Sequence, residues 1–167
     1  MAKPPISFFV PGMAGPSGSK TIMRGAGGRA WLRPSSKRQR PWQKVVSSVA
    51  AYHLCGKIHQ PVGVPLYLAF AFEFERPKSH LLSDGTPRKG APGIIAAGNA
   101  DVTKLARATE DALKGILFSD DRQTRALFAT STYSRRTGCQ ITAILINDGI
   151  DFDWLGAQVH SLVQGAA

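Results

Sequence analysis

A chain of 167 residues has the length of one domain and is long enough to bury a hydrophobic core without disulfides or metals. With 43% hydrophobic and 19% charged residues it has the composition of a soluble globular domain, and no apolar run approaches the roughly 20 residues of a membrane span. The N-terminal stretch has no secretory h-region, so we expect a cytoplasmic protein. Cys55 and Cys139 have no partners at metal-ligand spacing, and we expect both to be reduced and buried.

The formal net charge of +10 is distributed unevenly along the chain. Residues 1–72 contain ten lysines and arginines and no acidic residue, whereas residues 73–167 contain eleven residues of each sign. Such a one-sided basic field favours an anionic polymer or a membrane surface as partner, because cations that meet phosphates release bound counterions. A basic surface that only keeps the protein in solution is the alternative, but the clustering of the cations disfavours it.

The first third of the chain is predicted to form a strand, a long basic loop and a helix. The apolar run at 6–10 predicts the strand, and helical spacing of apolar residues from Trp42 predicts a helix that ends at Gly56. Between them, residues 11–41 mix Gly, Pro and Ser with basic residues, which indicates an extended loop, pinched into a small hairpin around "GAGG" with Trp31 as an anchor. The cations of this loop are Lys20, Arg24, Arg29, Arg33, Lys37, Arg38 and Arg40.

One segment of the basic loop, "GPSGSKT", is similar to a phosphate-binding P-loop but does not fit the pattern. Ser19 separates Gly18 from Lys20, and no helix is evident after Thr21. We therefore expect no nucleotide cofactor.

The rest of the chain is predicted to add three strands and two helices. Alternating Phe residues at 64–78 indicate a central strand, and a loop at 79–93 leads to a helix that begins near residue 101. Two further strands, at 125–134 and 139–147, are expected to form a hairpin through the turn "RRTG". Residues 148–167 form a C-terminal helix or tail in this prediction.

Five of the eleven acidic residues lie between positions 97 and 123: Asp101, Glu110, Asp111, Asp120 and Asp121. Asp101 stands at the helix entrance, and Asp120 and Asp121 stand in the turn after the helix, so packing of the helix on the sheet could bring the two ends together. Two or three converging carboxylates suffice for Mg²⁺. The alternative is structural: an N-cap at Asp101, turn residues after the helix, and Glu110 paired with Lys114 on a solvated face. Spacing alone favours this alternative and leaves Asp111 open.

The stretch "DVTKLARATEDALKGILFSDDRQ" closely resembles the core of the RusA-type Holliday junction resolvases, which are small, often phage-encoded, homodimeric endonucleases. In that family a D-x-D-N-L-x-(basic) segment opens a helix that contains D-A-L, and a turn with D-D-x-Q follows. The flanking order "VPG…GSK", "PWQKVV" and "RPKSH" is also similar, so the resemblance covers most of residues 6–147. It implies an α+β fold, with a single domain over 1–167 in which a small mixed β-sheet packs with two to three helices.

With "DAL" as the anchor, the resemblance carries five positions over to this chain. The two leading acids of the family pattern correspond to Asp101 and Thr103, and its Asn corresponds to Lys104. Its basic helix residue corresponds to Arg107, and its last metal-binding acid corresponds to Asp121. Thr103 is a departure, because a hydroxyl can bind Mg²⁺ but brings no negative charge. A register shifted by two places Asn99 and Asp101 on the acid pair but needs two extra helical residues, and both registers keep Asp101.

The resemblance implies a Mg²⁺-dependent endodeoxyribonuclease, with Mn²⁺ as a possible substitute, that resolves four-way DNA junctions by paired symmetric cuts as a homodimer. Asp101, Asp121 and Thr103 would hold the metal with help from Asp120, and Arg107 would stabilise the transition state. The cations of the basic loop and Lys104 would bind branched DNA. Two alternatives stay open: a branched-DNA-binding protein without catalysis, and a nuclease for another branched substrate.

Overall fold

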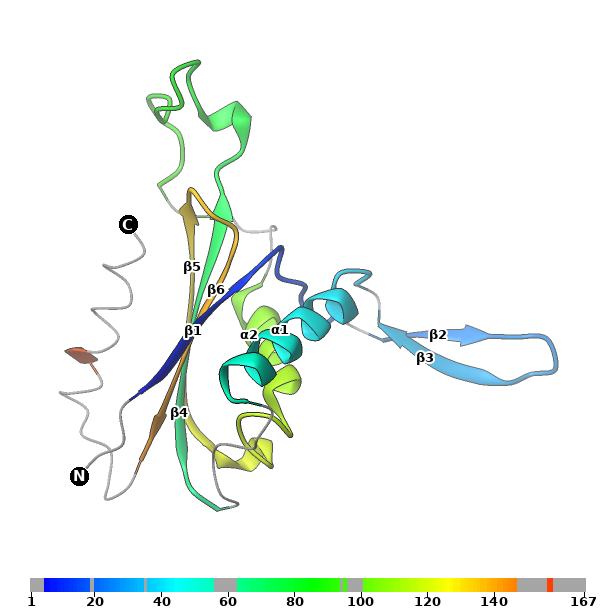
Figure 1. The fold of residues 1–167 in the computed structure, drawn as a ribbon. Coiled ribbons are helices and arrows are strands. Elements are labelled where there is room, and N and C mark those ends of the chain that lie inside the picture. Colours follow the sequence, from blue (N-terminus) through cyan, green and yellow to red (C-terminus); the bar gives the residue numbers. More distant parts are fainter. Residues whose placement is uncertain are drawn as a thin grey trace.

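The computed structural model describes residues 5–18, 20–34, 36–55, 63–93, 95, 101–146 and 156–157. A sheet forms the body of the molecule, two helices cover one of its faces, and a two-stranded ribbon projects away from both (Figure 1). In chain order the described elements are β1 (Ile6–Pro11), β2 (Lys20–Arg24), β3 (Ala30–Pro34), α1 (Gln39–His53), β4 (Leu66–Glu75), η1 (Lys78–His80), α2 (Val102–Leu113), η2 (Asp121–Gln123), β5 (Thr124–Ser134) and β6 (Gly138–Leu145).

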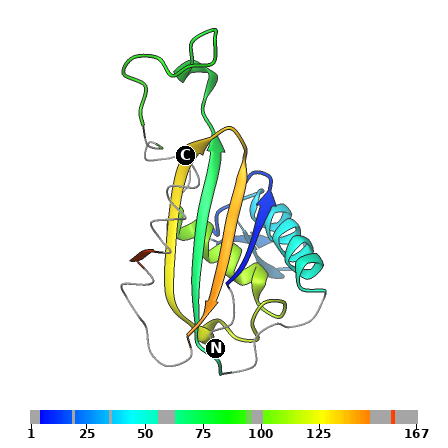
Figure 2. The same ribbon diagram turned by 60° about the vertical axis from the view of Figure 1, so that its left-hand side comes forward.

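The main sheet is mixed and has the strand order β1-β6-β4-β5 (Figure 2). β4 is parallel to β5 and antiparallel to β6, and β6 is antiparallel to β1. Residues 66–73 of β4 are all buried, so this strand is covered on both faces and paired on both edges, as predicted for a central strand. The α+β prediction is confirmed.

The predicted hairpin between β5 and β6 is wrong. Both strands form, and a three-residue turn joins them, but β4 lies between them in the sheet. The signal "RRTG" specifies a local turn and carries no information about pairing. Because β4 is apolar on both faces, it takes the protected central place and separates two strands that are neighbours in sequence.

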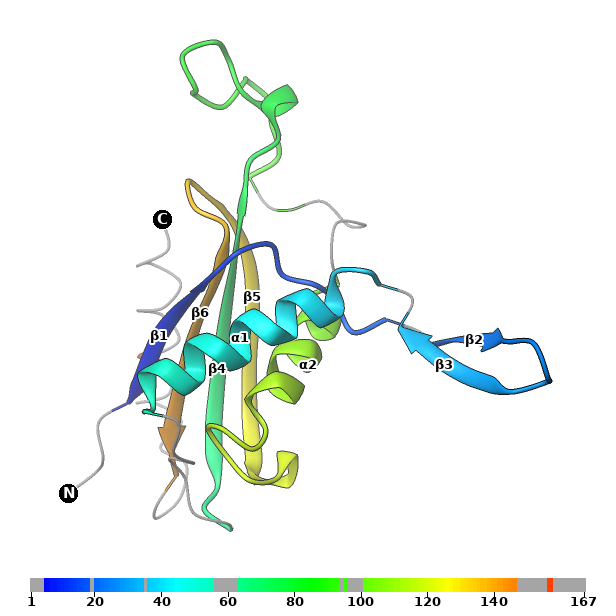
Figure 3. The same cartoon turned by 45° about the vertical axis from the view of Figure 1, so that its right-hand side comes forward.

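α1 and α2 lie side by side on one face of the sheet (Figure 3). The buried indole Nε1 of Trp42 donates to Thr109 Oγ1 at 3.0 Å, and Ser47 Oγ donates to the carbonyl of Ala112 at 2.9 Å. Apolar side chains of both helices join the single large core cluster with the inner faces of β1, β4 and β6. Hydrogen bonds between the helices and shared burial therefore fix the direction of α2.

The predicted basic loop contains the ribbon formed by β2 and β3, with the turn at "GAGG" as expected. Ile22 pairs with Leu32 and Met23 with Trp31, and the two strands form a sheet of their own. Gly27 and its neighbour Gly28 have φ angles of 88° and 77°, which side chains other than Gly rarely adopt. Thr21 lies within β2, whereas a P-loop needs a helix to begin after this position.

Three further expectations concern single features. Cys139 is buried as expected, whereas Cys55 is exposed because it follows the end of α1 at the surface; neither forms a disulfide. Among the described residues no helix is long and apolar enough to cross a membrane. The predicted helix or tail at 148–167 lies outside the described residues, apart from 156–157.

Candidate active site

Asp101 is the N-cap of α2. Its Oδ1 accepts from the backbone N of Thr103 at 3.0 Å and from the hydroxyl of Thr103 at 2.5 Å, while Oδ2 lies 3.3 Å from Nζ of Lys104. The hydrogen bond from the Thr103 hydroxyl, with help from Lys104, holds the pKa of Asp101 below its ordinary value. An exposed, ionised carboxylate therefore stands at the start of the helix, as the N-cap prediction required.

Asp120 and Asp121 lie beyond the other end of α2. Asp121 Oδ1 lies 3.2 Å from Nζ of Lys114, and Lys114 is the residue that directly follows the last residue of α2. Asp120 caps η2 by accepting from the backbone N of Arg122 at 2.9 Å, and it forms an ion pair with the same residue's guanidinium at 3.1 Å. These bonds from Arg122 lower the pKa of Asp120. Gln123 completes the capping box by accepting from the backbone N of Asp120 at 3.1 Å.

Glu110 and Asp111 belong to the same acidic end. Lys114 forms its ion pair with Asp121, so the structure does not contain the predicted pair between Lys114 and Glu110. Glu110 is half-buried, and burial, together with the negative charges of Asp111 and Asp121, raises the pKa of its carboxyl group. Asp111 points to solvent from the helix surface.

The length of α2 keeps its two acidic ends apart. Twelve residues at 1.5 Å per residue give a helix of about 18 Å. Mg²⁺ binds oxygen at about 2.0–2.1 Å, so two carboxylates that share one ion lie within about 5 Å of each other. Because Asp121 pairs with Lys114, just beyond the last residue of α2, one chain does not bring Asp101 and Asp121 to the same ion. In the described part of the chain, no three His, Cys, Asp or Glu side chains gather as a potential metal site.

The ribbon that carries several of the predicted DNA-binding residues is attached close to the Asp101 end of α2. Ser17, just before the ribbon, donates its backbone N–H to the carbonyl of Lys104 at 2.9 Å. Gly15 packs against the backbone of Arg38 so closely that a Cβ would collide with the carbonyl group. The base of the ribbon is thus attached to the first turns of α1 and α2 (Figure 3). Six of the predicted residues have exposed side chains: Arg24, Arg29, Lys37, Arg38, Arg40 and Lys104.

The catalytic Arg107 of the prediction is exposed on α2, one turn after Lys104. Lys20 and Arg33 contribute their backbones to the paired strands of the ribbon. All predicted cations of this group therefore lie on the ribbon, at the start of α1 or in the first half of α2, and none lies at the Asp121 end.

Comparison with models of protein families assigns the chain to a family. A family model described as Endodeoxyribonuclease RusA matches residues 12–143, which include the ribbon, both helices and both acidic ends. The chain belongs to the RusA endodeoxyribonuclease family. RusA proteins are endodeoxyribonucleases of the Holliday junction resolvase type and act on branched DNA junctions, which confirms the resemblance found in the sequence. A search of curated proteins found no match to this chain.

Proposed function

We propose that this member of the RusA family is a homodimeric, Mg²⁺-dependent endodeoxyribonuclease that resolves four-way DNA junctions by paired symmetric cuts. The observation that carries the proposal is the position of Asp101: an ionised carboxylate at the N-terminus of α2, next to the attachment of a projecting basic ribbon. A phosphodiester drawn in by the ribbon meets this carboxylate end of the helix first.

Each residue has a defined part in this proposal. A bound Mg²⁺, or Mn²⁺ in its place, would supply a Lewis acid for the scissile phosphate and for the attacking water. Asp101 and the hydroxyl of Thr103 would supply oxygen ligands at one end of α2, and Asp121, assisted by Asp120, would supply them at the other. Arg107 lies on the exposed face of α2 and stabilises the charge that develops on the phosphate.

The separation of Asp101 from Asp121 makes the dimer a requirement for a shared ion. A two-fold axis that sets two α2 helices antiparallel brings Asp101 of one copy next to Asp121 of the other, and it does so twice. The exposed surface of α2 suits this arrangement, because the cations Lys104 and Arg107 lie in its first half and Asp111 in its second. Two composite sites would match the two cuts that a four-way junction needs.

The ribbon provides most of the DNA contact. Between residues 20 and 34 it carries four cations and no acid. Three of its apolar side chains are largely in solvent, with exposed fractions of 62% for Ile22, 52% for Trp31 and 56% for Leu32. The cations suit the phosphates and the apolar groups suit unstacked bases at a branch point.

Cleavage of a labelled synthetic four-way junction tests the function. The purified protein is incubated with Mg²⁺, with Mn²⁺ or with a chelator, and Asp121→Asn is compared with the wild type. We expect paired symmetric nicks that need the metal and that disappear in the variant. Cleavage that persists in Asp121→Asn, or in chelator, would refute the proposed metal site.

Mixed dimers test the composite site separately. Asp101→Asn and Asp121→Asn are each expected to be inactive as homodimers. If each site takes one acid from each copy, the mixed dimer has one site with both mutations and one intact site, so mixing restores nicking of a single strand. If each site lies within one chain, both sites of the mixed dimer carry a mutation and mixing restores nothing.

A second candidate function rests on Lys104. Its ammonium lies 3.3 Å from Asp101, and Thr103 adds no charge, so a cation of the protein already neutralises this carboxylate. A chain in which Lys104 replaces the metal would bind junctions without cutting them. Equal junction affinity in chelator and in Mg²⁺, with no nicks under either metal, would select this binding function over the nuclease.

A further inference from the structure

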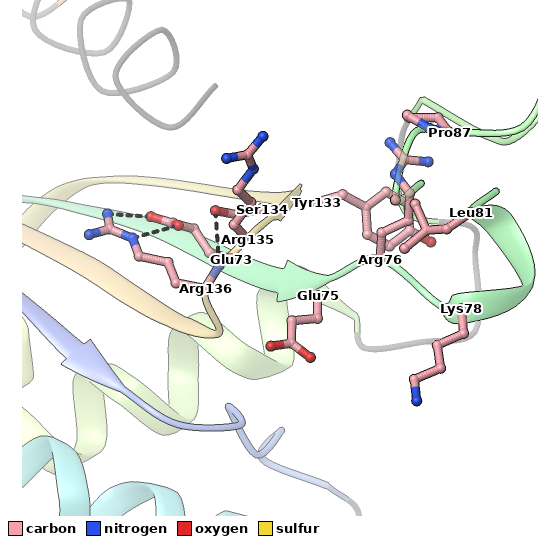
Figure 4. A pocket seen from close by; sticks show the side chains of 11 residues that line it. Glu73, Glu75, Arg76, Lys78, Leu81, Pro87, Tyr133, Ser134, Arg135 and Arg136 are labelled. Atoms are coloured by element: carbon pink, nitrogen blue, oxygen red, sulfur yellow. Dashed lines mark hydrogen bonds and ion pairs between the residues drawn. The ribbon is translucent and has the colours of Figure 1, made fainter. Parts of the chain in front are cut away.

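A basic groove lies at the far end of the sheet from η2, where β4 and β5 end. It has a volume of about 900 Å³ and is formed by the end of β4, the loop after it and the turn between β5 and β6 (Figure 4). The ribbon projects from a different side of the molecule in both Figure 1 and Figure 3. The groove is therefore a surface of its own, and none of its lining residues belongs to the predicted DNA-binding set.

The turn on one side of the groove is held firmly. The guanidinium of Arg136 donates to both carboxylate oxygens of the buried Glu73, at 2.7 and 2.8 Å, and lies 4.0 Å from the ring centre of Phe9. A Cβ at Gly138 would collide with that ring, so the strand after the turn is closely packed as well. The neighbouring Arg135 is left exposed at the edge of the groove, with no carboxylate partner among the described residues.

On the opposite side of the groove, an arginine side chain stacks on an aromatic ring. The guanidinium of Arg76 lies 4.5 Å from the ring centre of Tyr133 and donates to the carbonyl of Pro92 at 2.6 Å. The hydroxyl of Tyr133 is enclosed and has no hydrogen-bond partner in the part of the chain described. Lys78 also lines the groove, and its side chain is exposed.

The charges of the groove favour an anionic ligand. Within the described residues, three lining cations have no carboxylate partner, namely Arg76, Lys78 and Arg135, against one lining acid without a cationic partner, Glu75. Separate cations around an open groove suit consecutive phosphates of a polymer, since each can meet one phosphate without base contacts.

We propose that the groove binds the sugar–phosphate backbone of a second DNA arm while the ribbon holds the first. The inference rests on the proposed function, because it takes branched DNA as the substrate. Two basic surfaces on different sides of one molecule reach two arms that diverge from a branch point, whereas a linear duplex meets one of them at a time. The groove thereby makes the protein selective for branched over linear DNA.

Binding without metal tests this proposal independently of cleavage. Fluorescence anisotropy in chelator gives the Kd for a four-way junction and for a linear duplex at several salt concentrations. We expect Lys78→Ala and Arg135→Ala each to weaken junction binding about threefold to tenfold, and to reduce the slope of log K against log salt by about 0.9 per lost phosphate contact. Duplex binding should change less than twofold. Lys44→Ala, which removes an exposed cation of α1, is the matched control and should leave both affinities unchanged.

Two results would overturn the proposal. If Lys78→Ala and Arg135→Ala bind the junction as tightly as Lys44→Ala does, the groove does not contact DNA. If they weaken junction and duplex equally, the groove contacts DNA but does not select a second arm. A wild-type protein that shows the expected binding pattern but never cuts would refute the proposed catalysis and leave the groove in place.

Discussion

In the ion pair between Glu73 and Arg136, loss of one partner should lower the free energy of unfolding much more than loss of the other. Glu73 lies on the central strand with 1% of its side chain exposed, whereas 52% of the Arg136 side chain is exposed. Removing Arg136 leaves a buried carboxylate at the wall of the groove, with Ser134 as its remaining hydrogen-bond partner. Removing the charge of Glu73 leaves a guanidinium that can turn to solvent.

The structure sets the expected magnitudes. Arg136→Ala should lower the free energy of unfolding by about 3–5 kcal/mol, which is the usual result of leaving a buried charge without its partner. Glu73→Gln keeps the side-chain volume and loses only the ionic part of two hydrogen bonds, so we expect about 1–2 kcal/mol. Urea unfolding of both variants at pH 7 measures the two values.

The pH dependence of the free energy of unfolding is a second test of the same ion pair. The hydrogen bonds from Arg136 hold the pKa of Glu73 below its ordinary value, so the stability from this group is present above the unfolded-state pKa of about 4.3 and is lost as the pH falls through the folded-state pKa. In Arg136→Ala burial dominates and raises that pKa, so protonation removes the buried charge as the pH falls from 7. The difference in the free energy of unfolding between wild type and Arg136→Ala should therefore become smaller as the pH falls.

Two results would refute this account: an equal loss of unfolding free energy in Arg136→Ala and Glu73→Gln, or a difference between wild type and Arg136→Ala that stays constant between pH 7 and pH 5. Either result would mean that water or another group solvates the Glu73 carboxylate once Arg136 is gone. Because all other carboxylates are common to wild type and variant, their titration cancels in the difference.

Three further predictions concern the helix pair, the metal site and the ribbon. Thr109→Val removes the acceptor of the buried Trp42 indole and should cost about 1–3 kcal/mol in urea unfolding, whereas Thr109→Ser keeps the hydroxyl and should cost less; equal costs would count against that hydrogen bond. Thr103→Asp adds a second carboxylate beside Asp101 and should lower the Mg²⁺ concentration for half-maximal junction cleavage; an unchanged titration would show that Thr103 is not a ligand. If the exposed indole of Trp31 stacks on bases, as proposed, Trp31→Ala should weaken junction binding at least threefold, measured by anisotropy, with an unchanged far-UV circular dichroism spectrum; unchanged affinity would exclude that contact.

Local patterns predicted the elements of this fold because they depend on neighbours in sequence. The period of α2, its cap at Asp101 and the turn at "GAGG" are all decided within a few residues, and each forms as predicted. The pairing of β5 and β6 depends instead on where β4 lies, which a turn motif does not encode. The contact between Glu73 and Arg136 joins residues 63 positions apart, and only the assembled sheet brings them together.

The separation of Asp101 from Asp121 shows what a motif can and cannot say about a site. The family pattern marks both residues, and an α2 helix about 18 Å long separates Asp101 at its start from Lys114, the partner of Asp121, at its end. Packing a helix against a sheet therefore cannot bring its two ends to one ion. Asp101 and Asp121 can serve the same ion only if different copies of the chain supply them, so a motif within one chain can describe a site that forms between two.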